Sequence, residues 1–179
     1  MNTSNRRSTI RPLYPDEWAI YRELRLRSLA DAPDAFYSTF ESENARSAED
    51  WAARLAAAAV SGKDCPLLAE LDGQPAGLVW AKMDSVNPAL VHLFQMWVAP
   101  ECRGRGVGRG LLDAALDWAR EREVRFAELD VTLSNSSALR LYERAGFKAV
   151  NAPVPMRAGS DLMLQQMRLV LDGVAAQEA

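Results

Sequence analysis

The chain has 179 residues, 49% hydrophobic and 25% charged, which is typical of one globular domain, so we expect a single domain over residues 1–179 with loose tails at 1–7 and 172–179. The net charge of −3, with no signal-peptide core and no run of about 20 apolar residues, argues against nucleic-acid and membrane partners and predicts a bacterial-type cytoplasmic protein. Two cysteines and one histidine exclude a disulfide framework and argue against a zinc site, so we expect no metal.

In the N-terminal part the pattern predicts a short strand, two helices and a break between them. Pro33 disfavours helix at the residue before it and ends the first helix, and an irregular aromatic segment follows. Ser47 and the acidic residues after it are typical of an N-cap for the second helix. These elements are the strand 8–12, the helix that begins at residue 16, the irregular segment 36–40 and the helix 51–60.

The rest of the chain alternates predicted strands and helices. The run 90–98 is apolar except for His92 and Gln95, as a central strand should be. A helix that ends at Gly146 with Phe147 after it has the pattern of a Schellman ending. The predicted elements are a hairpin of 67–71 and 76–83, the strand 90–98, the helix 106–121, the strand 125–133, the helix 134–145 and the strand 162–171.

Three arginines crowd into one glycine-rich segment, residues 103–109, between a predicted strand and a predicted helix. A helix N-terminus offers unpaired N–H groups and a partial positive charge, and glycines let an anion approach the backbone. Guanidinium groups suit phosphate oxygens. The segment therefore predicts a phosphate or pyrophosphate site, with a solvent-exposed Arg/Gly turn as the alternative. The glycine spacing fits neither a P-loop nor a dinucleotide-binding fingerprint.

Two blocks of this sequence resemble the GNAT superfamily of N-acetyltransferases. Arg103-x-x-Gly106-x-Gly108, after the strand end at 96–100, resembles the family's acetyl-CoA pyrophosphate loop. The second block is similar to the family's next motif and comprises Leu129, Val131, Asn135, Ala138, Leu141, Tyr142, Gly146 and Phe147. The resemblance is close over residues 90–150 and looser over the whole chain.

This resemblance implies a fold and a co-substrate. The expected fold is α/β (α+β): a mixed, mostly antiparallel sheet of about six to seven strands, flanked by about four helices, with two strands splayed to admit acetyl-CoA. The backbone of Met96 and Val98 is expected to pair with pantetheine as an added strand would. The implied acetyl-CoA contacts are Met96, Trp97, Val98, Arg103, Gly104, Arg105, Gly106, Val107, Gly108, Arg109, Asn135, Ala138 and Tyr142.

Acetylation of an amine needs a base for the ammonium, and the departing thiolate needs a proton. By resemblance Tyr142 is the candidate acid beside the thioester sulfur, although its apolar stripe suits core packing equally well. His92 stands where family members often carry a carboxylate that acts as a base through water. A histidine can accept a proton near neutral pH, but a lone one on an apolar strand is commonly a core residue.

The acceptor pocket is expected between the N-terminal helices, their connecting loop and the strand ends. The candidate contacts are aromatic residues that suit the core equally well: Phe36, Tyr37, Phe40, Trp80 and Trp97. We expect direct transfer of the acetyl group to a primary amine of a small molecule in a ternary complex. A protein N-terminus or lysine is an alternative acceptor, and a non-catalytic acyl-CoA-binding module is the alternative of another class. The resemblance also suggests a homodimer.

Overall fold

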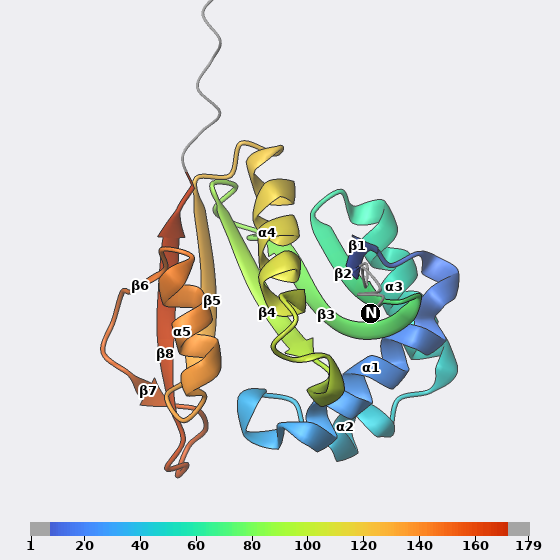
Figure 1. Ribbon diagram of the computed structural model, residues 1–179, viewed down its shortest axis with the longest axis horizontal. Coiled ribbons are helices and arrows are strands. Elements are labelled where there is room, and N and C mark those ends of the chain that lie inside the picture. Colours follow the sequence, from blue (N-terminus) through green and yellow to red (C-terminus); the bar gives the residue numbers. More distant parts are fainter. Residues whose placement is uncertain (1–7, 172–179) are drawn as a thin grey trace, which may run out of the picture.

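One eight-stranded sheet with helices on both faces organises the chain, seen for residues 8–171 in a computed structural model (Figure 1). The tails that the sequence predicts to be loose lie outside these described residues. The strands are Ser8–Pro12 (β1), Asp64–Leu71 (β2), Gln74–Met83 (β3), Leu90–Val98 (β4), Phe126–Thr132 (β5), Lys148–Ala149 (β6), Val154–Pro155 (β7) and Met163–Val170 (β8). The α-helices are Trp18–Asp31 (α1), Phe40–Asn44 (α2), Ala48–Ser61 (α3), Val107–Arg120 (α4) and Ser136–Arg144 (α5).

The strand order is β1-β2-β3-β4-β5-β8-β6, and β7 also pairs with β8. Every pairing is antiparallel except that of β4 with β5. This parallel pairing covers only Leu90–His92 against Phe126–Glu128, so the two strands part beyond His92. Figure 1 shows β4 and β5 diverging from their paired end. The expected fold class, with two splayed strands, is confirmed.

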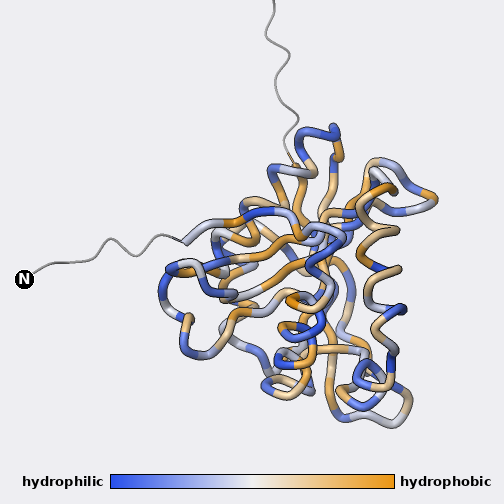
Figure 2. Tube along the Cα trace, turned by 90° about the vertical axis from the view of Figure 1, so that its right-hand side faces the viewer, coloured by the Kyte–Doolittle hydropathy of each residue, from blue (hydrophilic) through white to orange (hydrophobic). Residues whose placement is uncertain are grey.

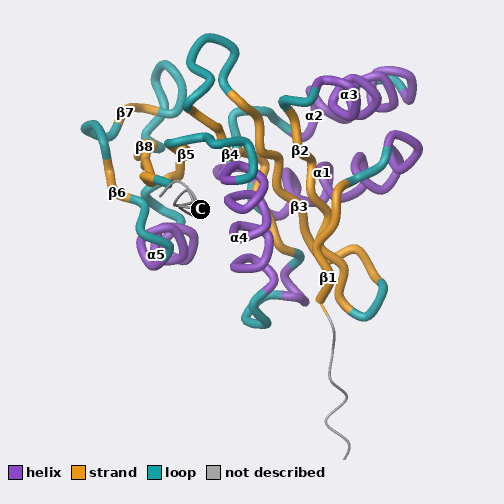
Figure 3. The backbone as a smooth tube through the Cα atoms, turned by 90° about the horizontal axis from the view of Figure 1, so that it is seen from above, coloured by secondary structure: helices purple, strands orange, loops and turns teal. Residues whose placement is uncertain are grey.

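Two apolar cores lie on opposite faces of the sheet. One core places α4 and Tyr142 of α5 against β2 to β5, and the other places α1 and α3 against the opposite face. Figure 3 shows α4 and α5 on one side of the strands and α1 and α3 on the other. The strands are largely hydrophobic and many of the connecting turns are hydrophilic (Figure 2). The shape follows from burial of apolar strand and helix faces, the dominant favourable term in folding.

Local signals place most helix ends as predicted. The Ser47 hydroxyl accepts from the Asp50 N–H at 3.1 Å, while the Asp50 carboxylate accepts from the Ser47 N–H, which caps α3. Gly146 follows α5 with a φ of 96°, as its predicted C-terminal role requires. The short elements α2, β6 and β7 are not among the predicted elements. They span two to five residues, too few to show a periodicity.

A β-bulge interrupts the pairing of β3 with β4. Trp80 pairs with Phe94 and Leu78 pairs with Trp97, so β4 carries one more residue than β3 at this point. Gln95 is the residue with left-handed backbone angles, at a φ of 56°. That conformation is strained for a residue with a side chain. The Gln95 side chain is buried, and its Oε1 accepts a hydrogen bond from the Tyr21 hydroxyl at 2.9 Å, which holds the bulge against α1.

Gly77 of β3 allows the sheet to close tightly beside this bulge. A Cβ at Gly77 would lie 2.6 Å from the Trp97 carbonyl oxygen, which belongs to the backbone and cannot move aside alone. We therefore expect Gly77→Ala to lower the free energy of unfolding by about 1–3 kcal/mol, measured by chemical denaturation. Gly110→Ala is the control. Gly110 lies inside α4, and a Cβ there would make only ordinary contacts with Ile10 of β1. This substitution should be neutral or stabilising, and equal losses for both variants would contradict the steric account.

Candidate active site

Two cavities meet where β4 and β5 part. The loop cavity, about 570 Å³, extends to Arg103 and Gly108. The histidine cavity, about 320 Å³, extends to His92 and Asp130. Both volumes suit small-molecule sites. The cavities share the lining residues Ala35, Phe36, Met96, Thr132, Asn135, Ala138 and Tyr142. A ligand in one cavity can therefore react with a ligand in the other at this junction.

The glycine-rich segment forms the turn between β4 and α4. Gly104 and Gly106 take left-handed backbone angles, with φ of 72° and 80°, which glycine adopts without steric cost. Helix α4 then begins at Val107 without a side-chain cap. The N–H groups of its first turn thus have no carbonyl partner within the helix, and they form the positive end of the helix dipole. This geometry suits an anion, as the sequence predicts.

Arg103 borders the loop cavity and is held by two acceptors. Its Nε donates to the Val98 carbonyl oxygen at 3.0 Å, and its Nη2 pairs with the Asp31 carboxylate. The same carboxylate accepts the Trp97 indole N–H at 2.8 Å. Burial opposes ionisation of Asp31, but hydrogen bonds from Trp97 and Arg103 outweigh it and lower the pKa of this carboxyl. The ionised Asp31 therefore fixes the guanidinium beside the glycine turn.

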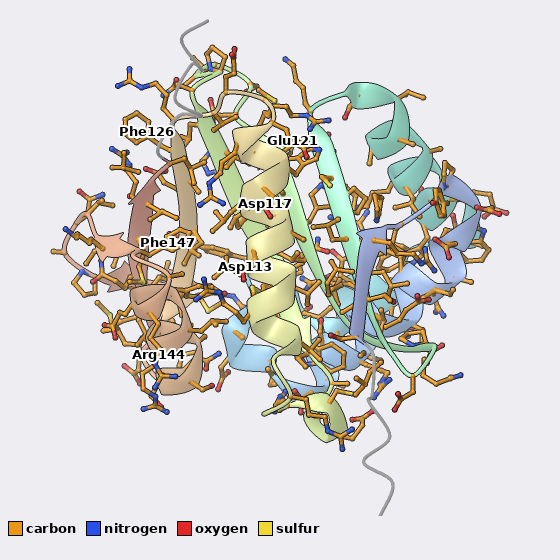
Figure 4. The ribbon with its side chains drawn as sticks, turned by 45° about the horizontal axis from the view of Figure 1, so that its top comes forward. Asp113, Asp117, Glu121, Phe126, Arg144 and Phe147 are labelled. Carbon is orange, nitrogen blue, oxygen red and sulfur yellow. The ribbon has the colours of Figure 1, made fainter. Side chains whose placement is uncertain are left out.

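The other two arginines of the segment do not line the loop cavity. The Arg109 Nε lies 2.8 Å from each carboxylate oxygen of Asp113, one turn further along α4. Asp113, Asp117 and Glu121 follow the outward side of this helix (Figure 4). Arg105 is exposed. Of the three arginines expected to surround one anion, only Arg103 lines the loop cavity, while Arg109 is paired with Asp113 on the solvent side of α4. The roles of Arg105 and Arg109 stay predictions.

Helix α5 and its N-cap bring Tyr142 and Asn135 to the junction, where the resemblance places acetyl-CoA contacts. Asn135 caps this helix: its Oδ1 accepts from the Ala138 N–H at 3.2 Å and from the Ser137 hydroxyl at 3.1 Å. The side-chain oxygen is thus engaged, and the Nδ2 amide is available to donate to a ligand.

The Tyr142 side chain lies at the junction and also packs on the core. It is 7% exposed, and its ring centroid is 5.9 Å from that of Phe147. Its hydroxyl makes no hydrogen bond to any residue of the described part, 8–171. Burial raises the pKa of Tyr142 to about 12, so the hydroxyl keeps its proton throughout the neutral range. Tyr142 thus belongs to the core and also lines both cavities, and its protonated hydroxyl is suited to donate a hydrogen bond.

His92 lines the histidine cavity and forms a pair with Asp84. Its Nε2 lies 2.9 Å from the Asp84 Oδ2. The N–H of Asn87, then His92, then the N–H of Val86 lower the pKa of Asp84 to about 2, so this carboxylate is ionised and accepts. An acceptor opposite Nε2 selects the tautomer that carries its proton there, which leaves Nδ1 with a lone pair. The pair has the chemistry of a base held by a carboxylate.

Asp130 is a second group of the histidine cavity that can take a proton. Burial and the charge of Glu128 raise the pKa of Asp130, while His92 acts in the opposite direction. Glu128 itself is buried and paired with Arg168, whose Nε lies 2.6 Å from its Oε1. Asp130 is therefore the carboxylate that remains free to act.

The aromatic candidates for the acceptor pocket separate into two groups. Phe36 and Tyr37 line the histidine cavity, and Trp97 lines the loop cavity. Trp80 and Phe40 line neither cavity, so nothing in this geometry supports them as acceptor contacts. Trp80 lies in the core beneath α1 and α3, and its Nε1 donates to Asp64 at 2.9 Å. Phe40 lies at the start of α2, partly exposed to solvent.

Sequence reasoning does not assign Gln95, Asp84 or Arg25 to the site. Gln95 carries a signal, because it is one of two polar residues in an otherwise apolar strand. Asp84 lies in a turn, and nothing in its sequence neighbourhood indicates the pairing with His92.

Within residues 8–171, no three His, Cys, Asp or Glu side chains are grouped so as to hold a metal ion. The same residues contain no helix that is long and apolar enough to cross a membrane.

Residues 16–147 match the acetyltransferase (GNAT) family. The chain belongs to this family. The matched segment runs from just before α1 through the glycine turn to the end of α5. It includes every lining residue of the loop cavity and all those of the histidine cavity except Met156, Leu164 and Gln166. Acetyl-CoA is the cofactor of GNAT enzymes, and the loop cavity with its uncapped helix N-terminus fits the pyrophosphate of that molecule.

Relatives and solved structures agree with this membership. A mycothiol acetyltransferase of Thermomonospora curvata is 36% identical over 142 residues, 78% of this chain and 43% of that protein. The chain spans only 27–44% of the length of the curated relatives it matches. A putative acetyltransferase of Acinetobacter baylyi superposes with a TM-score of 0.80 at 19% identity over 99% of both chains. A putative acetyltransferase of Salmonella typhimurium, solved with acetyl-CoA, gives 0.77 at 23% identity over 97% of this chain and 99% of that chain.

Proposed function

We propose that the protein transfers the acetyl group of acetyl-CoA to a primary amine of a small molecule. The observation that carries the proposal is the meeting of two unlike cavities at Met96 and Tyr142. One cavity ends at a helix N-terminus suited to pyrophosphate, and the other ends at a histidine held by a carboxylate. This arrangement places an acyl donor and a nucleophile on either side of one junction.

The acceptor class follows from the shape of the histidine cavity. Its volume of about 320 Å³ suits a small ligand. The cavity is lined in part by the segment 35–38 and by Met156 and Leu164, which follow α5 in the chain. Several relatives are named mycothiol acetyltransferases, which supports a small molecule as acceptor. A protein N-terminus or lysine is the alternative.

The transfer divides into three events. The amine lone pair attacks the thioester carbonyl carbon and forms the N–C bond. The C–S bond then breaks and CoA leaves as a thiolate. One proton passes from the amine nitrogen to a base, and the thiolate receives one proton, so that the products are an amide and free CoA. The gap between β4 and β5 holds the two reactants together and converts a bimolecular encounter into a local one.

Two side chains are proposed for the proton steps. His92, with its Nε2 directed to Asp84, takes the proton of the amine through Nδ1 or a water molecule. Tyr142 donates a hydrogen bond to the developing thiolate from the other side of the junction. The free backbone N–H groups at the start of α4, with Arg103, hold the pyrophosphate.

A thiol-release screen tests the proposal. The protein is incubated with acetyl-CoA and a panel of amino acids, polyamines, aminoglycosides and N-terminal peptides, and acetylated products are identified by mass spectrometry. Release of CoA with a small amine is the expected result. Saturable binding of acetyl-CoA with no release across the panel would instead support a non-catalytic binding module. Release with peptides alone would favour the protein-directed alternative.

The role of His92 is tested by a pair of variants. His92→Gln should lower kcat/KM at pH 7 roughly tenfold, since water can still accept the proton. Asp130→Asn should change kcat/KM much less. If Asp130→Asn loses this activity and His92→Gln keeps it, the role belongs to Asp130.

The homodimer and the cytoplasmic location stay predictions.

A further inference from the structure

Arg25 of α1 is a buried cation without a carboxylate partner. It is 2% exposed and lines the histidine cavity. Its Nη1 donates to the Ser28 hydroxyl at 3.3 Å, but its Nε has no partner among the described residues. No ion pair to Arg25 occurs within residues 8–171. Buried charges are ordinarily paired, because removing a charge from water costs a great deal of free energy. An unpaired one at a cavity wall points to a missing anion.

The remaining contacts of Arg25 do not neutralise it. Its guanidinium lies over the Phe36 ring at 4.5 Å, a cation–π contact that leaves the N–H donors free. Burial lowers the pKa of Arg25 to about 10, which is the expected result of desolvation without a counter-ion. The side chain is nevertheless protonated at pH 7, so the positive charge persists at this wall.

The neighbouring charges add to the cationic character of this end. Arg54 of α3 also lines the histidine cavity, over the rings of Tyr21 and Trp80. The nearby carboxylate is Glu43, which accepts from Arg54 at 3.3 Å and from Arg46 at 3.1 Å. The Glu43 charge also raises the pKa of Arg25, but among the described residues no hydrogen bond or ion pair joins the two side chains. Negative charge in the histidine cavity lies instead near Asp130, on β5.

We propose that the acceptor amine also carries a carboxylate, which binds Arg25 with help from Arg54 at the helical end of the histidine cavity. The inference rests on the proposed function and narrows its substrate class to amino acids in the broad sense. A carboxylate accepts the planar pair of N–H donors that a guanidinium offers. The amine of the same molecule then lies toward Met96, at the junction where the acetyl group arrives, and Asp130 and His92 line the same cavity. Cation and anion sites at different places in one cavity fit a zwitterion.

The first experiment compares each acid with its carboxamide. The probes are L-leucine, L-methionine, L-phenylalanine, β-alanine and γ-aminobutyrate, each beside its amide, in the thiol-release assay with acetyl-CoA. At least one acid should exceed its amide in kcat/KM by roughly 10- to 100-fold, the effect of a charge-assisted hydrogen bond. The α-amino acid amides have the less basic amine and hence more free amine at neutral pH, which works against this result. Equal or better turnover of every amide would overturn the proposal.

The second experiment changes the cation. Arg25→Met should reduce the ratio of kcat/KM for the acid to kcat/KM for its amide to about one. Its melting temperature should equal or exceed that of the wild type, because a buried unpaired charge has been removed. Arg46→Met is the control: it removes an arginine that is bonded to Glu43, but Arg46 lines neither cavity, so the preference should persist. A lower melting temperature with parallel losses for acid and amide would show a structural role and overturn the proposal.

If no acceptor turns over, a binding measurement tests the carboxylate site separately from the proposed acetyl transfer. Calorimetry with CoA-saturated protein compares N-acetyl-L-methionine with its amide, and likewise the other pairs. Tighter binding of an acid, lost in Arg25→Met, would support the carboxylate site even if the proposed transfer fails. No difference for any pair, in binding or in turnover, would reject the site whether or not the enzyme acetylates amines.

Discussion

Replacing Tyr142 with phenylalanine is expected to lower kcat by about 100- to 1,000-fold. The change removes one oxygen atom from a buried ring whose packing against Phe147 remains. The hydroxyl has no hydrogen-bond partner among the described residues, so its loss leaves no donor or acceptor unpaired in the core. Stability and the Kd for acetyl-CoA should therefore stay near their wild-type values, measured by thermal unfolding and calorimetry, while steady-state kinetics shows the loss.

The pH profile sharpens this prediction. The raised pKa of Tyr142, about 12, means that its donor function is present below that pH and is lost only as the pH rises through it. Tyr142 should therefore produce no limb in kcat near neutrality. Tyr14→Phe is the matched control, since Tyr14 is exposed and lines neither cavity. Unchanged turnover in Tyr142→Phe would remove the residue from the proton step.

Replacing Gly108 with aspartate should weaken acetyl-CoA binding by about 100-fold or more, because a carboxylate would face the pyrophosphate. A Cβ at this position makes only ordinary contacts, 3.6 Å from side-chain atoms of Leu141 and Val98. The fold should therefore accept the side chain. An acidic residue in the first turn of α4 also favours the helix dipole, so the melting temperature should hold or rise. The opposite signs of the two effects distinguish an anion site from general damage.

Gly108→Ala supplies the control for bulk at the same position. Its methyl group brings the Cβ without the charge, so the Kd for acetyl-CoA should rise less than in Gly108→Asp, as calorimetry would show. Equal weakening in both variants would attribute the effect to steric exclusion. Wild-type affinity in Gly108→Asp would remove the glycine turn from the cofactor site.

Much of this fold could be predicted from the sequence because its signals are local. The Ser47 cap, the Gly146 ending and the apolar run of β4 each depend on a few neighbouring residues. The glycine turn before α4 was also visible, because its backbone angles require glycine at fixed places. The Asn135 and Tyr142 pair follows from helical spacing alone.

The charged parts of the site could not be predicted in the same way. Three arginines in seven residues suggest a common ligand, yet helical geometry carries Arg109 to solvent beside Asp113. Arg25 is indistinguishable in sequence from the other arginines of α1, and only tertiary packing shows that it lacks a counter-ion. The pairing of His92 with Asp84 joins a strand to a turn eight residues away. Such pairings depend on three-dimensional neighbours, which periodicity does not describe.

The bulge at Gln95 has a consequence for the two cores. Val91 and Leu93 belong to the core beneath α4, whereas Trp97 and Ala99 belong to the core beneath α1 and α3. All four residues have odd numbers, so in the sequence the buried positions alternate without interruption. In the structure, however, the buried side chains change from one face of the sheet to the other at the bulge. The nine residues of β4 thus span the length that eight regularly paired strand residues would span. An extra residue in a central strand ordinarily inverts every side chain that follows it, and the bulge at Gln95 places this inversion beside Met96, where the two cavities meet.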